Sequence, residues 1–224
     1  MAHNKSVKAL ETKKRILEAA LKLFLEEGYE HATMRKIARL ANLTPGATYY
    51  HFKTKEHIIF HYYEKSYEDH LIAARAILSG SSGLRERIAG LIRTHLEVAS
   101  PYHDISKALF RVAASPGHSL SPFSEESRPL REKNILLFKE ALEGAAEKVP
   151  ASLLGKLPEL LWLFKMLIII FWLYDASTQQ QRTYRLIDKS TDLVVKLIAI
   201  SNLPVVRSFT EQLANLILEF KPYS

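Results

Sequence analysis

The chain has 224 residues, of which 47% are hydrophobic and 25% charged, values typical of a folded protein rather than a disordered one. It contains no cysteine, which excludes disulfides, thiolate nucleophiles and cysteine-ligated zinc. Residues 1–55 hold 11 of the 31 Lys and Arg residues but only 5 of the 24 Asp and Glu residues, so this quarter carries most of the net charge of +7. The asymmetry favours a polyanionic partner, although a solvated basic face with no partner explains the charge equally well.

Hydrophobic residues recur at helical spacing almost throughout, and no alternating strand pattern exceeds five residues, which predicts an all-α fold. Thr12 is the expected N-cap of the first helix, and Gly28 is the expected left-handed residue that ends it. Thr33 is expected to cap a second helix over 34–41. Asn42, which tolerates a positive φ, is expected to make the tight turn that follows.

A third helix of about seven residues is expected after this turn, with Thr44 as its N-cap and Pro45 at its first position. Residues 33–52 therefore predict a helix-turn-helix, in which the second helix of the pair enters the major groove of DNA. A step of 100° per residue places Thr48 and Phe52 of the third helix toward the core.

The opposite face of the third helix carries Gly46, Ala47 and Tyr50, with Tyr49 and His51 on its flanks. Small residues and aromatics on an outward face are unusual for a solvated helix, but they allow a close approach to base edges. The alternative is that one of the two tyrosines packs against the fourth helix.

The remaining helices are expected over 54–79 with Thr54 as cap, and over 84–99, 103–114, 124–148, 152–177, 180–201 and 204–219. The prediction is thus a three-helix N-terminal helix-turn-helix domain followed by a larger C-terminal bundle, about nine to ten helices in all.

The segments TKKRILEAALKLFLEEGYEHATMRKIARLANLT and PGATYYHFKTKEHII resemble the DNA-binding domain of the TetR family of bacterial transcriptional regulators. Asn42 stands where the family usually has Gly, and Thr48 replaces a commoner large apolar residue. The resemblance implies a DNA-binding domain over 9–57 and a ligand-binding and dimerisation domain over 58–224. Together with the outward face, it predicts DNA contacts from Thr33, Arg35, Thr44, Pro45, Gly46, Ala47, Tyr49, Tyr50, His51, Lys53 and Lys55. Arg35 pairing with Glu30 is an alternative.

Residues 160–174 are the most apolar stretch, but they number 15 with Lys165 among them, too few for a membrane span. A helix apolar all round is expected in a core or an oligomer interface. The family resemblance implies a homodimer joined through helices 152–177 and 180–201, and an effector pocket in the C-terminal bundle. Phe110, Trp162 and Met166 are the candidate lining residues for an apolar or amphipathic effector, although ordinary core packing explains each of them.

Signatures of catalysis are weak in this sequence. His57 and His61 have a spacing that can hold a metal, yet the Glu of a His-Glu-x-x-His site is missing, so a plain helix surface is expected. Neither a phosphate-binding loop nor a Gly-x-Ser-x-Gly elbow occurs. We therefore expect a non-enzyme without metal or cofactor, a ligand-responsive repressor that binds operator DNA.

Three expectations concern the context of the protein. The polar N-terminus lacks the features of a signal peptide, which predicts a cytoplasmic protein that joins the nucleoid when it is bound to DNA. A regulator of the same fold that activates, or that has no effector, is the first alternative. A membrane-surface or scaffold protein with its basic N-terminus on anionic lipid is the second.

Overall fold

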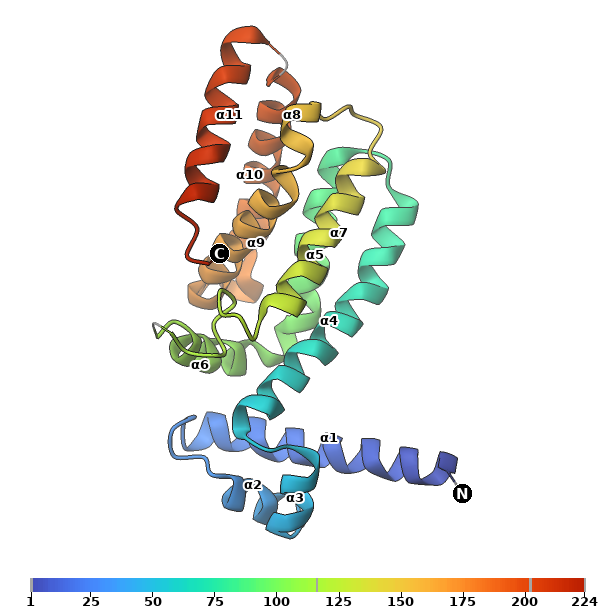
Figure 1. Cartoon of the computed structure of the whole chain (residues 1–224), viewed down its shortest axis with the longest axis vertical. Coiled ribbons are helices and arrows are strands. Elements are labelled where there is room, and N and C mark those ends of the chain that lie inside the picture. The colour runs from blue at the N-terminus through green and yellow to red at the C-terminus, as the bar shows by residue number, and fades with distance from the viewer. Residues whose placement is uncertain (1, 116, 202, 224) are drawn as a thin grey trace. The chain divides into compact units, whose positions relative to one another are not determined.

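The computed structural model describes residues 2–115, 117–201 and 203–223, and these residues form helices and turns without a strand. The all-α prediction is confirmed. The helices are α1 (Ala2–Glu26), α2 (Met34–Leu40), α3 (Pro45–His51), α4 (Lys55–Gly80), α5 (Leu84–Ala99), α6 (His103–Ala113), α7 (Arg128–Glu143), α8 (Ala151–Leu154), α9 (Leu157–Tyr174), α10 (Gln181–Ile200) and α11 (Pro204–Glu219), as labelled in Figure 1.

The chain divides into two compact units. The first unit comprises Met1–Ser66 and Tyr102–Ser127, and the second comprises Tyr67–Pro101 and Arg128–Ser224. Helix α4 therefore contributes its first part to the first unit and its second part to the second unit.

In the first unit, α2 and α3 pack on each other, and α1 packs on both α2 and α6. The buried core includes Phe24, Ile37, Phe52, Ile58 and Leu109. It forms because each helix carries apolar residues at helical spacing on one face. This packing fixes the positions of the two short helices that are expected to meet DNA.

The predicted start of the first helix is wrong. Thr12 lies inside α1, and its hydroxyl donates to the carbonyl of Lys8 at 2.8 Å instead of capping an N-terminus. A threonine hydroxyl can bond either way, and the residues before Thr12 include no helix breaker. The predicted end is confirmed, because Gly28 has a φ of 84° two residues after the last residue of the helix.

In the second unit, α5, α7, α9 and α10 form a bundle in which α7 packs on α9 and α5 packs on α7, α9 and α10 (Figure 1). Helix α11 packs on α8 and α9. Two predicted helices change here. The helix expected over 124–148 is confined to α7, and the one expected over 152–177 is interrupted, so that α8 and α9 are separate helices.

The apolar helix α9 passes a length and composition test for a membrane span, with 18 residues and a mean hydropathy of 1.8. The core helix of a water-soluble bundle passes the same test. Here 44% of the helix is buried by its neighbours, and Lys165, at its middle, is only 2% exposed. The exposed remainder is apolar and includes Leu167, Ile170, Phe171 and Tyr174.

Candidate nucleic-acid interface

The helix-turn-helix is built by the local signals that the sequence carries. Thr33 Oγ1 accepts from the backbone N–H of Lys36 at 3.3 Å, and Thr44 Oγ1 accepts from that of Ala47 at 3.2 Å. Asn42 has a φ of 52°, so it takes the left-handed conformation expected of the turn. The predicted caps and turn are confirmed, and Asn42 performs the task for which the family usually has Gly.

Arg15 of α1 holds the turn in place. Its guanidinium donates to the carbonyls of Ala41 and Asn42, the latter at 3.2 Å. These carbonyls follow the C-terminal end of α2, where the helix dipole favours a cation. One nitrogen of Arg15, Nη2, is therefore already used inside the protein.

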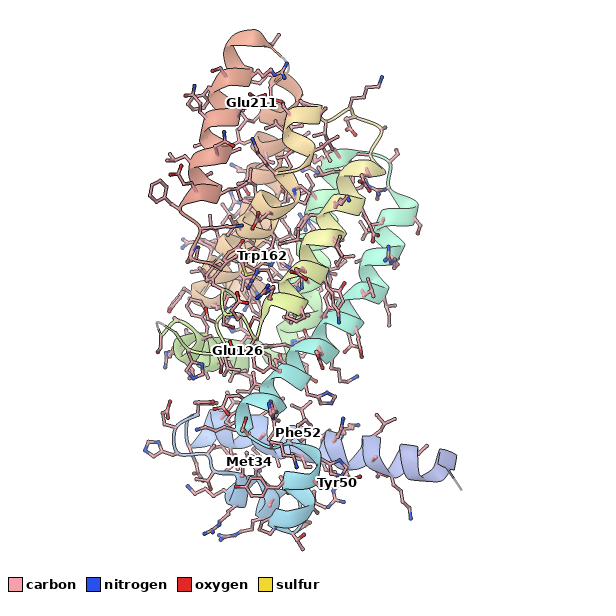
Figure 2. The ribbon with its side chains drawn as sticks, in the orientation of Figure 1. Met34, Tyr50, Phe52, Glu126, Trp162 and Glu211 are labelled. Atoms are coloured by element: carbon pink, nitrogen blue, oxygen red, sulfur yellow. The ribbon has the colours of Figure 1, made fainter. Side chains whose placement is uncertain are left out.

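Helix α3 presents the face predicted from its 100° period. Thr48 is fully buried, and its hydroxyl donates to the carbonyl of Thr44 at 3.2 Å. Phe52, the residue after the helix, is also buried, whereas Tyr50 is 79% exposed (Figure 2). Tyr49 is 43% exposed, so neither tyrosine is buried against the fourth helix, contrary to the alternative considered above.

The rest of the predicted α3 contact face is accessible as well. Thr44, Pro45 and Gly46 are exposed, and Ala47 and His51 are partly exposed. The His51 ring meets the Tyr50 ring edge to face, with centroids 5.2 Å apart. Burial and the nearby Lys13 lower the pKa of His51, so a neutral imidazole faces the solvent at neutral pH.

The basic residues beside α3 fall into two groups. Lys36 pairs with Glu27 and also donates to the carbonyl of His31. In contrast, Arg35, Arg39 and Lys53 are exposed, and no ion pair is recorded for them within the described residues, Glu30 included. Arg35 and Lys53 are among the predicted DNA contacts. Arg39 is not, although the helical period of 3.6 residues places it on the same polar face of α2 as Arg35.

Lys55 has a structural task in addition to its predicted phosphate contact. Its ammonium donates to the carbonyl of Tyr29 at 2.8 Å and lies 3.9 Å from the centroid of the Tyr29 ring. The Tyr29 hydroxyl in turn donates to Glu56, the next residue of α4. An ammonium has three donors, so Lys55 retains others for a phosphate while it fixes the start of α4.

The predicted effector residues do not all belong to one unit. Phe110 is on α6 in the first unit, whereas Trp162 and Met166 are on α9 in the second unit. Trp162, labelled in Figure 2, is 2% exposed. Its ring meets that of Tyr223 edge to face, with centroids 5.8 Å apart. Met166 and Phe110 are half-buried.

A buried polar cluster in the second unit was overlooked. It consists of His70 on α4, His95 on α5, Asn134 on α7 and Lys165 on α9. The signal in the sequence is a lysine, Lys165, inside an otherwise apolar helical run. Within the described part of the chain, no group of three or more His, Cys, Asp or Glu residues is arranged to hold a metal ion.

Two family models match the chain. Residues 16–62 match the model described as bacterial regulatory proteins, tetR family, and residues 87–216 match the tetracyclin repressor-like C-terminal domain. The second match alone covers more than half of the chain.

Curated relatives match in the N-terminal region. The chain is 42% identical over 59 residues to the HTH-type transcriptional regulator TtgW of Pseudomonas putida, which is 26% of this chain and 44% of that protein. It is 36% identical over 76 residues to TtgR of the same organism, covering 34% and 36% of the two chains. These alignments thus span less than half the length of either relative.

Solved structures share the fold over most of the chain. A TetR-family regulator from Syntrophomonas wolfei matches with a TM-score of 0.68 at 20% identity, covering 87% of this chain and 98% of that one. The TetR-family repressor FadR from Thermus thermophilus, solved with lauroyl-CoA, matches with a TM-score of 0.59 at 20% identity, covering 82% and 93%.

Proposed function

Because this chain belongs to the TetR family of bacterial regulatory proteins, we propose that it is a sequence-specific DNA-binding repressor. It acts as a homodimer on a near-palindromic operator, with the two α3 helices in successive major grooves, and a small effector releases it. Residues 9–57 form the DNA-binding part, and residues 58–224 bind the effector and the second subunit. Its place of action is the cytoplasm, at the nucleoid when it is bound to DNA.

The observation that carries the proposal is the exposed face of α3. This face carries Tyr50, which is 79% exposed, and Tyr49, which is 43% exposed, beside the small residues Gly46 and Ala47. Such a composition is unusual for a helix face that contacts only water. Arg35 and Arg39 on α2, and Lys53 shortly after α3, supply exposed cations in the same motif. Phosphate contacts by these cations would position the helix, and the α3 face would distinguish bases.

The second subunit is proposed from the exposed apolar surface of α9 and α10. On α9 this surface comprises Leu167, Ile170, Phe171 and Tyr174, and on α10 it comprises Leu193, Leu197 and Ile200. Exposed apolar residues on two helices that pack on each other favour an interface. Dimerisation also doubles the number of bases read, which one helix of seven residues needs for specificity.

The effector is proposed to act through α4, since this helix contributes residues to both units. A bound effector would favour a dimer conformation with another separation of the two α3 helices. A coupling free energy of about 1–3 kcal/mol would change operator affinity about 5–150-fold. The complex of FadR with lauroyl-CoA supports an amphipathic effector for a protein of this fold.

The experiment that tests the proposal is selection of bound fragments from the source genome by the purified protein, repeated across salt concentrations. Recovery of one short palindrome is the expected result. Equal recovery of all fragments would refute it, and binding to anionic vesicles would then favour the lipid-surface alternative. Reporter expression with and without the gene separates repression from activation.

Substitutions in the interface sharpen this test. Tyr50→Ala is expected to lower discrimination between operator and random DNA, because the exposed ring lies on the face that approaches the bases. Lys53→Ala is expected to weaken binding to both DNAs alike and to reduce the salt slope by about 1. Lys139→Ala, which removes an exposed charge from α7, is the control. Unchanged discrimination by Tyr50→Ala would contradict the assignment of the α3 face.

A further inference from the structure

The core of the second unit contains a cationic side chain that is nearly without protein partners. Lys165 is 2% exposed, and its ammonium donates to Oδ1 of Asn134. The ring of Phe138 lies 5.9 Å away, and no carboxylate pairs with Lys165 among the described residues. An ammonium has three donors and a full charge, so one amide oxygen leaves it under-compensated.

Two imidazoles lie within range of the Lys165 charge, which contributes to lowering the pKa of each. The rings of His70 and His95 meet edge to face with centroids 5.1 Å apart. His70 Nε2 donates to the carbonyl of Leu91 at 3.0 Å, so Nδ1 of the neutral ring is an acceptor. The Nδ1 atoms of His70 and His95 are both buried and have no hydrogen-bond partner within the described part of the chain.

Burial disfavours the charged form of each of these three groups. Burial lowers the pKa of Lys165 to about 7, and burial together with the Lys165 charge lowers the pKa of His70 to about 4. The pKa of His95 is also lowered, by burial first and then by the charge of Lys165. Each of the three would gain from an anion placed among them.

Another buried cation of the same unit has a different environment. Arg87 is 5% exposed and donates to four backbone carbonyls, those of Leu78, Ser81, Glu140 and Ala141. Arg87 thus joins helix ends, and its donors are satisfied by the fold. Lys165 has a single amide partner beside two unsatisfied imidazoles, and buried polar groups of this kind call for an explanation.

We propose that Lys165, His70 and His95 form a subsite for the carboxylate of an amphipathic organic acid. This inference rests on the proposed effector function and names the chemical class of the effector. The ammonium donates to one carboxylate oxygen, and an imidazole that takes up a proton at Nδ1 donates to the other. One ammonium and no guanidinium suit a single negative charge better than a phosphate dianion.

The surroundings of Lys165 suit an apolar tail. Leu161, Trp162, Ile168 and Trp172 lie three, four or seven residues from Lys165 on α9, which places them on its face of the helix. All four are buried, with at most 2% exposure. The carboxylate of the acid would compensate the charge of Lys165, and its apolar tail would displace some of these buried side chains. Binding would thereby change the packing of the bundle that contains the second part of α4.

The test uses the full-length protein and two acid probes, decanoate and phenylacetate, each with its primary amide as a neutral control. Isothermal titration is expected to detect binding of an acid and not of its amide. The affinity is expected to fall at least about tenfold from pH 6 to pH 8. The ammonium form of a group with a pKa of about 7 becomes the minor form over this range, and the proton that an imidazole takes up on binding makes the fall steeper.

Lys165→Met is expected to abolish acid binding, whereas Lys139→Met, an exposed lysine of the same unit, should leave it unchanged. Folding of both variants is checked by circular dichroism, and the pH dependence of the unsubstituted protein tests the subsite if Lys165→Met does not fold. Equal binding of acids and amides, no binding of either acid, or unchanged binding by Lys165→Met would overturn the proposal.

The outcome also separates this inference from the proposed function. Release of the operator by a neutral compound that binds without Lys165 would overturn the carboxylate subsite and leave the effector-released repressor intact. Binding of acids through Lys165 without any effect on operator affinity would keep the subsite and refute its role in regulation.

Discussion

Arg87 provides a quantitative test of how the second unit is held together. Its guanidinium donates to the carbonyls of Leu78 and Ser81 at the end of α4 at 2.7 and 2.8 Å, and to those of Ala141 and Glu140 at the end of α7 at 2.8 and 3.0 Å. Arg87→Met removes these donors from both helix ends. The carbonyls of Leu78, Ser81 and Ala141 lose the guanidinium, whereas that of Glu140 still accepts from the N–H of Gly144 at 3.1 Å.

The expected cost follows from these contacts. Each hydrogen bond from a charged donor contributes about 1.5–3 kcal/mol to the free energy of unfolding. The substitution also removes the desolvation penalty of the buried guanidinium, which offsets several kcal/mol of this loss. The net loss in the free energy of unfolding is expected to be about 3 kcal/mol. The neighbouring Arg85 pairs with Asp188 and Asp192 and is 39% exposed, so Arg85→Met should cost less than about 1 kcal/mol.

Gly144 extends the test to a double-mutant cycle. A Cβ at this position would lie 2.3 Å from Nη2 of Arg87, and the guanidinium cannot move away because four carbonyls hold it. Gly144→Ala is therefore expected to destabilise the protein. It should cost less in the Arg87→Met background, where only the 3.3 Å approach to the Glu140 carbonyl remains. Urea denaturation followed at 222 nm, at one fixed protein concentration, measures all variants. Equal costs for Arg87→Met and Arg85→Met would refute the reasoning.

Two further predictions concern the same unit. The carboxylate of Asp175 accepts from the backbone N–H of Ser177 at 2.9 Å and from the N–H and hydroxyl of Thr183, and these contacts outweigh burial and lower its pKa to about 2. The resulting stabilisation of about 2 kcal/mol is complete above pH 5 and is lost as the pH falls toward 2. In Asp175→Asn the free energy of unfolding should therefore vary less between pH 5 and pH 2. Leu193→Glu, at a residue of α10 that is 68% exposed, is expected to make the protein monomeric in sedimentation. Ile72→Glu, at a residue of α4 that is 75% exposed, is the control and is expected to leave it dimeric. A dimeric Leu193→Glu protein would contradict the proposed interface.

The elements predicted correctly are those with local causes. Thr33, Thr44 and Thr54 each accept a hydrogen bond from a backbone N–H three residues later, and Gly28 and Asn42 adopt positive φ. A cap or a turn is decided within four residues, so its signal is contained in the sequence.

The helix bounds that were wrong depend on contacts from elsewhere or on an overlooked proline. Ser124 and Ser127 bond to each other and Ser124 to Ser119, which replaces the predicted start of α7 by turns. Glu147 lies outside the helix because its carboxylate accepts from the N–H of Leu84 at the start of α5. The break before α9 was readable, since Pro158 fits only the first turn of a helix.

The candidate site shows the same division. The outward face of α3 follows from a 100° period and was predicted, because burial of Thr48 on one side dictates exposure of Tyr50 on the other. The Lys165 cluster was overlooked because His70, His95 and Asn134 are distant in the sequence and come together only through the packing of the bundle. No spacing rule connects residues on four different helices.

The two buried cations of the second unit lead to opposite expectations for one substitution. Lys165→Met should raise the free energy of unfolding. Folding lowers the pKa of this lysine from its ordinary value to about 7, and the resulting loss of protonation costs roughly 4 kcal/mol at pH 7. This gain in the free energy of unfolding should shrink to about half at pH 9, because the lysine of the unfolded chain is then closer to losing its own proton. Arg87→Met should lower the same quantity, since its four carbonyls lose their donor. If both substitutions destabilised the protein alike at pH 7, Lys165 would be a structural residue, and the fold itself would explain its burial.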